Sequence, residues 1–310
     1  MRSLPGENGF DYSTMNWAKL TNRGYELSLS TVNVKTKDFR WVMDFNLAHN
    51  KSKINRLNVR DNSYEPSREG YSVGAVFSLK TAGLDENGLQ MFYNKQGEKV
   101  SFNDFFGLEY GYMMGGLIPF LKSNLSAEEY RNLFTYEGTT EPKFTGGWIN
   151  RFYYKNFDLT VSASFVLDQT VQEQPFYNPV QTSPGQNYSR RMSQIWSPDN
   201  TSGKYPRIMG TYTEGEENWA YQWLGMLDPG NSYRKYDYWF KKMSYMRINS
   251  IRLGYTFPER LLGHIGFSSA RISFEARNPF VFGSSYKGYF DPETYGNIYT
   301  QPLAKTFSCG

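Results

Sequence analysis

Side chains that could perform catalysis or bind a metal are few in this 310-residue chain and lie far apart. The two histidines, His49 and His264, have no cysteine or second histidine at the spacing that a zinc site needs. Cys309, the single cysteine, has no histidine near it in sequence and is interpreted as an ordinary strand residue rather than a nucleophile. The glycines of "GLDENG" and "GYMMGG" lack the lysine and the strand-to-helix context of a phosphate loop. We therefore expect no metal and no cofactor.

Carboxylates gather in two acidic segments, "EGEEN" at 214–218 and "DPET" at 291–294. A pair of carboxylates can carry out glycoside hydrolysis, so a secreted glycosidase is one hypothesis. Acidic residues in solvated loops are more often ordinary surface groups. The chain is predicted not to be an enzyme.

Aromatic side chains alternate in the segment "ENWAYQWLGML", which contains Trp219, Tyr221 and Trp223. Their flat faces could stack on sugar rings or hold apolar peptide side chains. They could equally pack a long loop against its neighbours, since such a loop needs internal contacts to be ordered. These three residues are the candidate ligand-binding residues.

The composition favours β-structure and excludes several classes of protein. Aromatic residues make up 18% of the chain and glycine is frequent, with 28 residues. The net charge is only +4 and no basic run is long enough to follow a phosphate backbone, so nucleic acid is not expected as a partner. The start, "MRSLPGENGFDY", has no apolar export signal, and no apolar run reaches the ~18 residues of a membrane helix. A membrane β-barrel stays possible because its strands are short and half polar.

Strict alternation of apolar and polar residues marks four segments as strands with one face of each kind. In "FRWVMDFNLAHN" at 39–50 the apolar row is large, and in "FDLTVSASFVL" at 157–167 the polar residues are small. The same pattern returns in "SIRLGYTFP" at 250–258 and in "ARISFEAR" at 270–277. Each apolar row must face either lipid or another layer of protein.

The spacing of the strands predicts hairpins separated by long connections. Segments 24–34 and 39–50 are joined by "KTKD", and segments 143–154 and 157–168 by "KN". The links 51–142 and 170–240 are far longer than the ~4–6 residues usual in compact domains. Short turns on one side and long loops on the other are typical of transmembrane barrels. In a soluble sandwich, the other possibility, the apolar rows would pack against a second sheet.

A capping box predicts one short helix inside the first long link. Ser126 opens the segment "SAEEYRNLF", and Glu129 follows three residues later. We expect a helix of about two turns there.

Several segments resemble a known family in order along the chain. "NRGYELSLSTVNVKTKDFRWVMDFNLAHNKSKINRL" resembles a segment of the SusC/RagA-like TonB-linked outer-membrane proteins of the Bacteroidetes, through Asn22, Gly24, Glu26, Phe39 and Trp41. "GYSVGAVFSLKTAGLDENG" is similar to the family's segment ending in G-L-D-x-x-G, and "GTTEPKFTGGWINRFYYKNFDLTVSASF" to one of its hairpins. "MSYMRINSIRLGYTFPERLL", "RISFEARNPFVF" and "YFDPE" follow in the family's order.

This resemblance implies an antiparallel transmembrane β-barrel of the plugged class with roughly 22 strands. Residues 1–310 would be the C-terminal portion of the barrel, about seven strands, with 51–142 and 170–240 as long extracellular loops. The plug domain and the signal peptide are expected to be absent from this chain. The implied function is import of glycans or peptides across the bacterial outer membrane.

The resemblance also implies the partners. They are a SusD-like surface lipoprotein, TonB acting through the absent N-terminal part, the remaining barrel strands, the lipid bilayer, and a glycan or peptide ligand. The polar rows would face the lumen with the residues Arg40, Asp44, Asn46, Asp158, Thr160, Arg252, Arg271 and Glu275. The alternative is a soluble all-β glycan-binding module, whose apolar rows would meet between two sheets.

Overall fold

The computed structural model describes residues 2–3, 12–13, 18–57, 66–113, 118–179, 182, 185–208, 232–263, 266–283, 291–294, 301 and 303–310. The chain divides into two compact units. The sheet unit comprises Thr21–Ser52, Thr139–Val171 and Lys241–Gly310. The aromatic unit comprises Met1–Leu20, Lys53–Gly138 and Gln172–Phe240.

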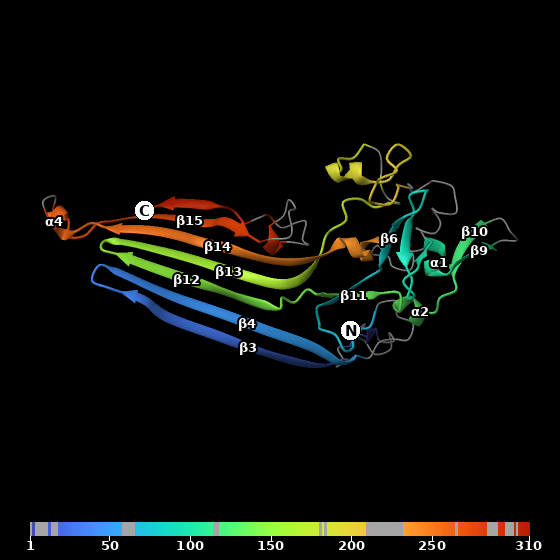
Figure 1. The fold of residues 1–310 in the computed structure, drawn as a ribbon, viewed down its shortest axis with the longest axis horizontal. Coiled ribbons are helices and arrows are strands. Elements are labelled where there is room, and N and C mark those ends of the chain that lie inside the picture. Colours follow the sequence, from blue (N-terminus) through green and yellow to red (C-terminus); the bar gives the residue numbers. More distant parts are fainter. Residues whose placement is uncertain are drawn as a thin grey trace. The chain divides into compact units, whose positions relative to one another are not determined.

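A seven-stranded sheet dominates the sheet unit, and its long strands lie side by side (Figure 1). From one edge to the other, the strands are β16 (Thr306–Cys309), β15 (Arg271–Phe282), β14 (Phe240–Thr256), β13 (Phe157–Gln172), β12 (Phe144–Tyr154), β4 (Phe39–Leu57) and β3 (Ala18–Lys35). β3 and β4 have 18 and 19 residues, well above the ~9–11 that cross a bilayer. The predicted all-β class is confirmed.

Both predicted hairpins are present, and local hydrogen bonds explain their tight turns. Between β3 and β4, the amide of Phe39 donates to Thr36 Oγ1 at 3.0 Å. Between β12 and β13, Lys155 has a φ of 52°, the left-handed conformation that two-residue hairpin turns require. The two turns also bind each other, since the amide of Lys155 donates to the carbonyl of Asp38 at 2.9 Å.

In their described residues, the remaining links of the sheet unit contain two short helical turns. α4 (Glu259–Leu262) lies between β14 and β15, and the 3-10 helix η7 (Pro292–Thr294) lies between β15 and β16. The pairing of β14 with β15 shifts register between Ile248 and Ser250. Such a bulge bends the strand and turns its side chains locally.

Short elements build the aromatic unit. Its strands are β1 (Arg2–Ser3), β2 (Tyr12–Ser13), β5 (Ala75–Ser78), β6 (Thr81–Leu84), β7 (Gln90–Tyr93), β8 (Lys99–Val100), β9 (Leu108–Met113), β10 (Ile118–Ser123) and β11 (Thr135–Thr139). β6, β7 and β8 form one sheet, and β5 pairs with β11. The helical turns are α1 (Phe102–Phe106), α2 (Ala127–Arg131), η3 (Arg190–Gln194), η4 (Ser232–Lys235) and η5 (Asp237–Trp239).

α2 confirms the capping-box prediction. The amide of Glu129 donates to Ser126 Oγ at 3.3 Å, and the amide of Ser126 donates to Glu129 Oε2 at 2.8 Å. These two bonds satisfy donors that a helix start leaves without partners. The helix has only five residues, shorter than the two turns expected.

The core of the aromatic unit is made almost entirely of rings. Phe92, Phe106, Tyr236 and Trp239 have no exposed surface, and Phe92 stacks on Phe105 with their ring centroids 4.4 Å apart. Aromatic side chains bury large areas and orient each other, which suits an irregular unit that has only short strands. These rings come from two segments that are far apart in sequence, 92–106 and 236–239.

The apolar face of the sheet is exposed rather than covered. The side chains of Leu253, Phe157 and Ile272 are 46%, 48% and 50% exposed. A soluble sandwich would bury this row against a second sheet. No part of the chain that the structure describes does so for these side chains.

Candidate functional site

Strand pairing brings the eight predicted polar residues to one face of the sheet. Arg40 pairs with Tyr153, which pairs with Asp158, and paired residues share a face. Arg252 lies opposite Glu275 in the same way. Asp44 and Asn46 follow Arg40 along β4, and Thr160 follows Asp158 along β13, in each case by an even number of residues and therefore on the same face. Arg271 precedes Glu275 along β15 in the same way. We call this surface the polar face.

Ser162 and Ser250 connect the part of the polar face on β4, β12 and β13 with the part on β14 and β15. Their hydroxyl oxygens lie 2.8 Å apart on the neighbouring strands β13 and β14. Close by, Ser164 Oγ donates to Asn249 Oδ1 at 3.1 Å, at the register shift between β14 and β15. The small polar residues of β13 therefore make the polar face continuous from β4 to β15.

Asp158 and Arg271 form an ion pair that crosses a strand. Arg271 Nη2 lies 2.7 Å from Asp158 Oδ1, although β14 separates β13 from β15. Gly254 of β14 makes this contact possible, because a Cβ there would stand 2.2 Å from Arg271 Nη2. Arg271 Nη1 also donates to Thr256 Oγ1 at 3.3 Å.

A second ion pair lies toward the other edge of the polar face. Arg151 Nη1 and Asp44 Oδ2 are 2.5 Å apart on β12 and β4. Ser30 of β3 donates its hydroxyl to Asp44 Oδ1 at 2.7 Å. Three neighbouring strands are therefore tied together by one carboxylate.

Arginines outnumber carboxylates over the paired part of the polar face. Arg277 Nε lies 3.0 Å from Glu275 Oε1, with Arg252 opposite Glu275 in the sheet. The arginines are Arg40, Arg151, Arg252, Arg271 and Arg277, and the acids are Asp44, Asp158 and Glu275. A row of paired charges keeps its hydrogen bonds when it faces water and would be costly to bury in an apolar core.

The opposite face carries rings at positions that the alternation predicts. Trp41 stacks on Phe152 with centroids 5.6 Å apart, and the ring centroids of Phe157 and Tyr255 lie 4.6 Å apart. Trp41 donates its indole N–H to Asn150 Oδ1 at 2.9 Å. This bond satisfies a polar group on an otherwise apolar face.

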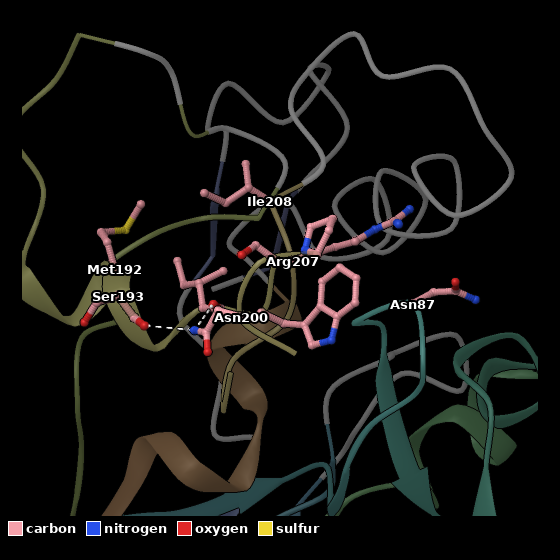
Figure 2. A pocket seen from close by; sticks show the side chains of 10 residues that line it. Asn87, Met192, Ser193, Asn200, Arg207 and Ile208 are labelled. Atoms are coloured by element: carbon pink, nitrogen blue, oxygen red, sulfur yellow. Dashed lines mark hydrogen bonds between the residues drawn. The ribbon is translucent and has the colours of Figure 1, made fainter. Parts of the chain in front are cut away.

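A pocket of about 720 Å³ lies in the aromatic unit, where the sequence predicted no site. Its ten lining residues are Asn87, Met192, Ser193, Ile195, Trp196, Ser197, Pro198, Asn200, Arg207 and Ile208. Figure 2 shows Asn87 approaching from the β6–β7 turn and the other labelled residues from the segment 192–208. We call it the 196 pocket.

The predicted ligand-binding residues Trp219, Tyr221 and Trp223 lie outside the described residues, as does His264. His49 is described, and its Nδ1 lies 2.5 Å from the carbonyl oxygen of Lys143. Within the described ranges, no three metal-ligating side chains come together. No helix in that part of the chain is long and apolar enough to cross a membrane.

Comparison with known proteins identifies the class. No protein-family model matches the chain. TonB-dependent receptor P3 of Formosa agariphila is 27% identical over 94% of the chain, and TonB-dependent receptor SusC of Bacteroides thetaiotaomicron is 25% identical over 98%. The chain spans 27% of the length of each of these relatives.

Solved structures show the same fold. A chain in the structure of the RagAB peptide transporter superposes with a TM-score of 0.67 at 20% identity, covering 99% of this chain and 31% of that chain. The RagAB peptide importer in its open-open state gives a TM-score of 0.59 over 96% of this chain.

These findings confirm the predicted class: the chain is SusC/RagA-like, similar in sequence and fold to part of a TonB-dependent transporter. Proteins of this class reside in the bacterial outer membrane, which confirms the predicted localisation. They are receptors and transporters, which confirms that the chain is not an enzyme.

Proposed function

We propose that this chain forms part of the barrel wall and the outer loops of a TonB-dependent transporter that imports glycans or peptides. The observation that carries the proposal is the two-faced sheet. One face exposes large apolar side chains such as Leu253 and Ile272, and the other carries ion pairs. A bilayer on one side and water on the other stabilise such a sheet on both faces.

The proposed mechanism binds a solute and makes or breaks no bond. The polar face lines the lumen, where paired side chains such as Arg271 and Asp158 can exchange one partner for the solute. Charge-assisted hydrogen bonds of this kind are strong but reversible. TonB supplies the energy by acting on a part of the transporter other than this chain.

The segments 51–142 and 170–240 are proposed as extracellular loops. Support comes from the aromatic unit, which gathers Lys53–Gly138 and Gln172–Phe240 around its own core of rings. Loops packed in this way can hold a fixed shape. They would contact the ligand and a SusD-like surface lipoprotein, with Trp219, Tyr221 and Trp223 as candidate contacts.

The soluble glycan-binding module is less compatible with this structure. A soluble protein with so many exposed apolar side chains on one sheet would aggregate or need a covering partner. Phe157 and Phe274 are each nearly half exposed on that face.

Fractionation of the source cells with an affinity tag on the transporter tests the function. We expect the tagged protein in the outer-membrane fraction, together with a surface lipoprotein. Its deletion should abolish growth on one class of oligomeric nutrient, and so should deletion of TonB. A tagged protein found in the soluble fraction, or uptake that continues without TonB, would refute the proposal.

A further inference from the structure

Two cations end the apolar face of the sheet at the strand ends far from the β3–β4 turn. Along β3 the exposed apolar side chains are Tyr25, Leu27 and Leu29, and the next residue of that row is Arg23. Along β4 the apolar row leads in the same way to Lys51, and both cations are exposed. Counted from the turn, both lie just beyond the ~9–11 residues that cross a bilayer. In a barrel wall they would lie where the hydrocarbon meets the headgroups.

Arg23 and Lys51 lie opposite each other on the paired strands β3 and β4. A Cβ on Gly24 would be 2.5 Å from the carbonyl oxygen of His49 and 3.4 Å from Cα of Asn50, so Gly24 lies opposite Asn50. In an antiparallel hairpin, the next residues on the two strands are then Arg23 and Lys51, with their Cβ atoms about 5 Å apart. Like charges in this position destabilise a sheet. An anion bound between them would remove that cost.

The described part of the chain supplies no carboxylate to neutralise this pair. Neither Arg23 nor Lys51 has an ion pair or a side-chain hydrogen bond with any described residue. Glu26, the acid of β3, belongs to the other row of that strand and so to the polar face. Glu141 accepts the hydroxyl of Ser52 at 2.7 Å, and Ser52 follows Lys51 on the opposite face. Both charges are therefore available to an anion from outside the described chain.

A third cation lies beside β12. The ring of His49 contacts those of Tyr25 and Phe144, with centroids 5.0 and 5.1 Å away. His49 Nδ1 donates to the carbonyl of Lys143 at 2.5 Å, because a carbonyl oxygen can only accept. The exposed ammonium of Lys143 lies 5.8 Å from the ring centroid of Phe144. We call these three cations the basic rim: Arg23, Lys51 and Lys143.

The basic rim and the apolar face beside it together fit a lipid that carries phosphate. Phosphate oxygens accept charge-assisted hydrogen bonds from arginine and lysine, and basic clusters at a membrane surface attract anionic headgroups. The apolar side chains next to the rim are well exposed, with 56% for Tyr25 and 50% for Leu27. A soluble anion would leave them uncovered. An acyl chain attached to the phosphorylated headgroup would cover them.

We infer that the basic rim binds the phosphorylated headgroup of an outer-leaflet lipid, with the acyl chains on the apolar face of β3 and β4. The rim lies at the strand ends where the long link between β4 and β12 begins, and long loops of membrane barrels are extracellular. This assigns the site to the outer leaflet. The inference rests on the proposed transport function and adds a specific lipid partner to it.

Native mass spectrometry of the purified transporter that contains this chain, in detergent, tests the inference. The probes are lipid A with two phosphate groups, the same lipid A with both phosphates removed, and inorganic pyrophosphate. We expect the phosphorylated lipid to be retained and the dephosphorylated lipid to bind at least about tenfold more weakly, since charge-assisted hydrogen bonds are lost. Pyrophosphate at the same concentration should not displace the lipid, because it lacks the acyl chains.

Three variants complete the experiment. Lys51→Gln and Arg23→Gln should each weaken retention of phosphorylated lipid A about tenfold, because each removes one charge-assisted bond. Lys37→Gln is the matched control, since Lys37 is also exposed but lies in the β3–β4 turn at the other end of the same strands. It should retain lipid A like the wild type. All three side chains are exposed, so folding should survive each change.

Equal retention of the two forms of lipid A would overturn the inference. So would displacement of the lipid by pyrophosphate, no effect of Lys51→Gln and Arg23→Gln, or an equal loss in Lys37→Gln. TonB-dependent uptake that persists in any of these cases would leave the transport function intact. Absence of the wild-type transporter from the outer membrane, or loss of its uptake, would instead contradict the proposed function itself.

Discussion

Asp158 of β13 and Arg271 of β15 form an ion pair over β14, the strand that lies between them. The contact depends on Gly254 of β14, because a Cβ there would lie 2.2 Å from Arg271 Nη2. Three strands are thereby joined on the polar face by a side-chain bond in addition to their backbone ladders. The glycine is explained by this close approach and not by backbone conformation.

Gly254→Ala is expected to separate this ion pair without unfolding the sheet. The new methyl group would meet the movable end of Arg271, which can swing away. A double-mutant cycle of Asp158→Asn and Arg271→Met, with the melting temperature of each variant as the measurement, gives the coupling between the two side chains. This coupling should be present in the wild-type background and absent in the Gly254→Ala background. Gly263→Ala is the control, because nothing lies within 4 Å of a Cβ at that position. Persistent coupling in Gly254→Ala would contradict this explanation.

Gly88→Ala should damage the 196 pocket far more than a matched glycine replacement. Gly97→Ala is the match, because its φ of 80° imposes a similar backbone penalty of about 1 kcal/mol while a Cβ there meets nothing. At Gly88 the methyl group would also overlap Trp196. We expect a further loss of about 1–3 kcal/mol, measured by denaturant unfolding. Equal losses for the two variants would show that the contact with Trp196 is unimportant.

The capping box makes α2 sensitive to acid. The backbone hydrogen bond from Ser126 lowers the pKa of Glu129 below its ordinary value of 4.5, with further help from the Ser126 hydroxyl. A lowered pKa means that ionised Glu129 stabilises the folded helix. This stabilisation is complete above the ordinary pKa and is lost as the pH falls through the folded-state value.

Carbon-13 NMR of the Glu129 carboxyl should therefore give a midpoint below 4.5. Glu129→Ala should remove this contribution to the pH dependence of α2. Glu128→Ala, which takes a charge from the same first turn but leaves both capping bonds, is the control. A midpoint at or above 4.5 would contradict the structure of the cap.

Arg247 holds the 291–294 turn against β14. Its side chain is 2% exposed, and it bonds to Asp291 and, at 2.8 Å, to Glu293. Arg247→Met would leave the carboxylate of Asp291, itself only 9% exposed, without this charged partner. Breaking a buried pair in this way costs about 3 kcal/mol, which unfolding in guanidinium can measure. Arg277→Met, at a residue whose side chain is 64% exposed, should change stability little, and equal effects would refute the assignment.

Local pattern predicted the sheet well. Alternation in 39–50 and 157–167 located β4 and β13, because a period of two needs no knowledge of distant residues. The same alternation assigned the faces, so Arg40 and Asp158 were expected together. The Ser126 capping box is equally local.

Long-range packing could not be predicted in the same way. Phe92 and Tyr236 meet in the aromatic core from segments that show no shared periodicity. The 196 pocket also joins two distant segments, and its single signal in the sequence is the last glycine of "GLDENG". The contact between Asp158 and Arg271 was missed because it skips a strand.

The most direct test of the two-faced sheet uses neighbouring residues of β13. Leu159 and Thr160 point to opposite faces, so nitroxide labels at these positions should report opposite environments. In the transporter reconstituted into liposomes, with the exposed Cys309 replaced by serine, relaxation by oxygen reports lipid and relaxation by a nickel chelate reports water. We predict that oxygen dominates at Leu159 and the nickel chelate at Thr160. A label at Leu159 that is shielded from lipid, or one at Thr160 that is embedded in it, would contradict a sheet that lies between bilayer and water.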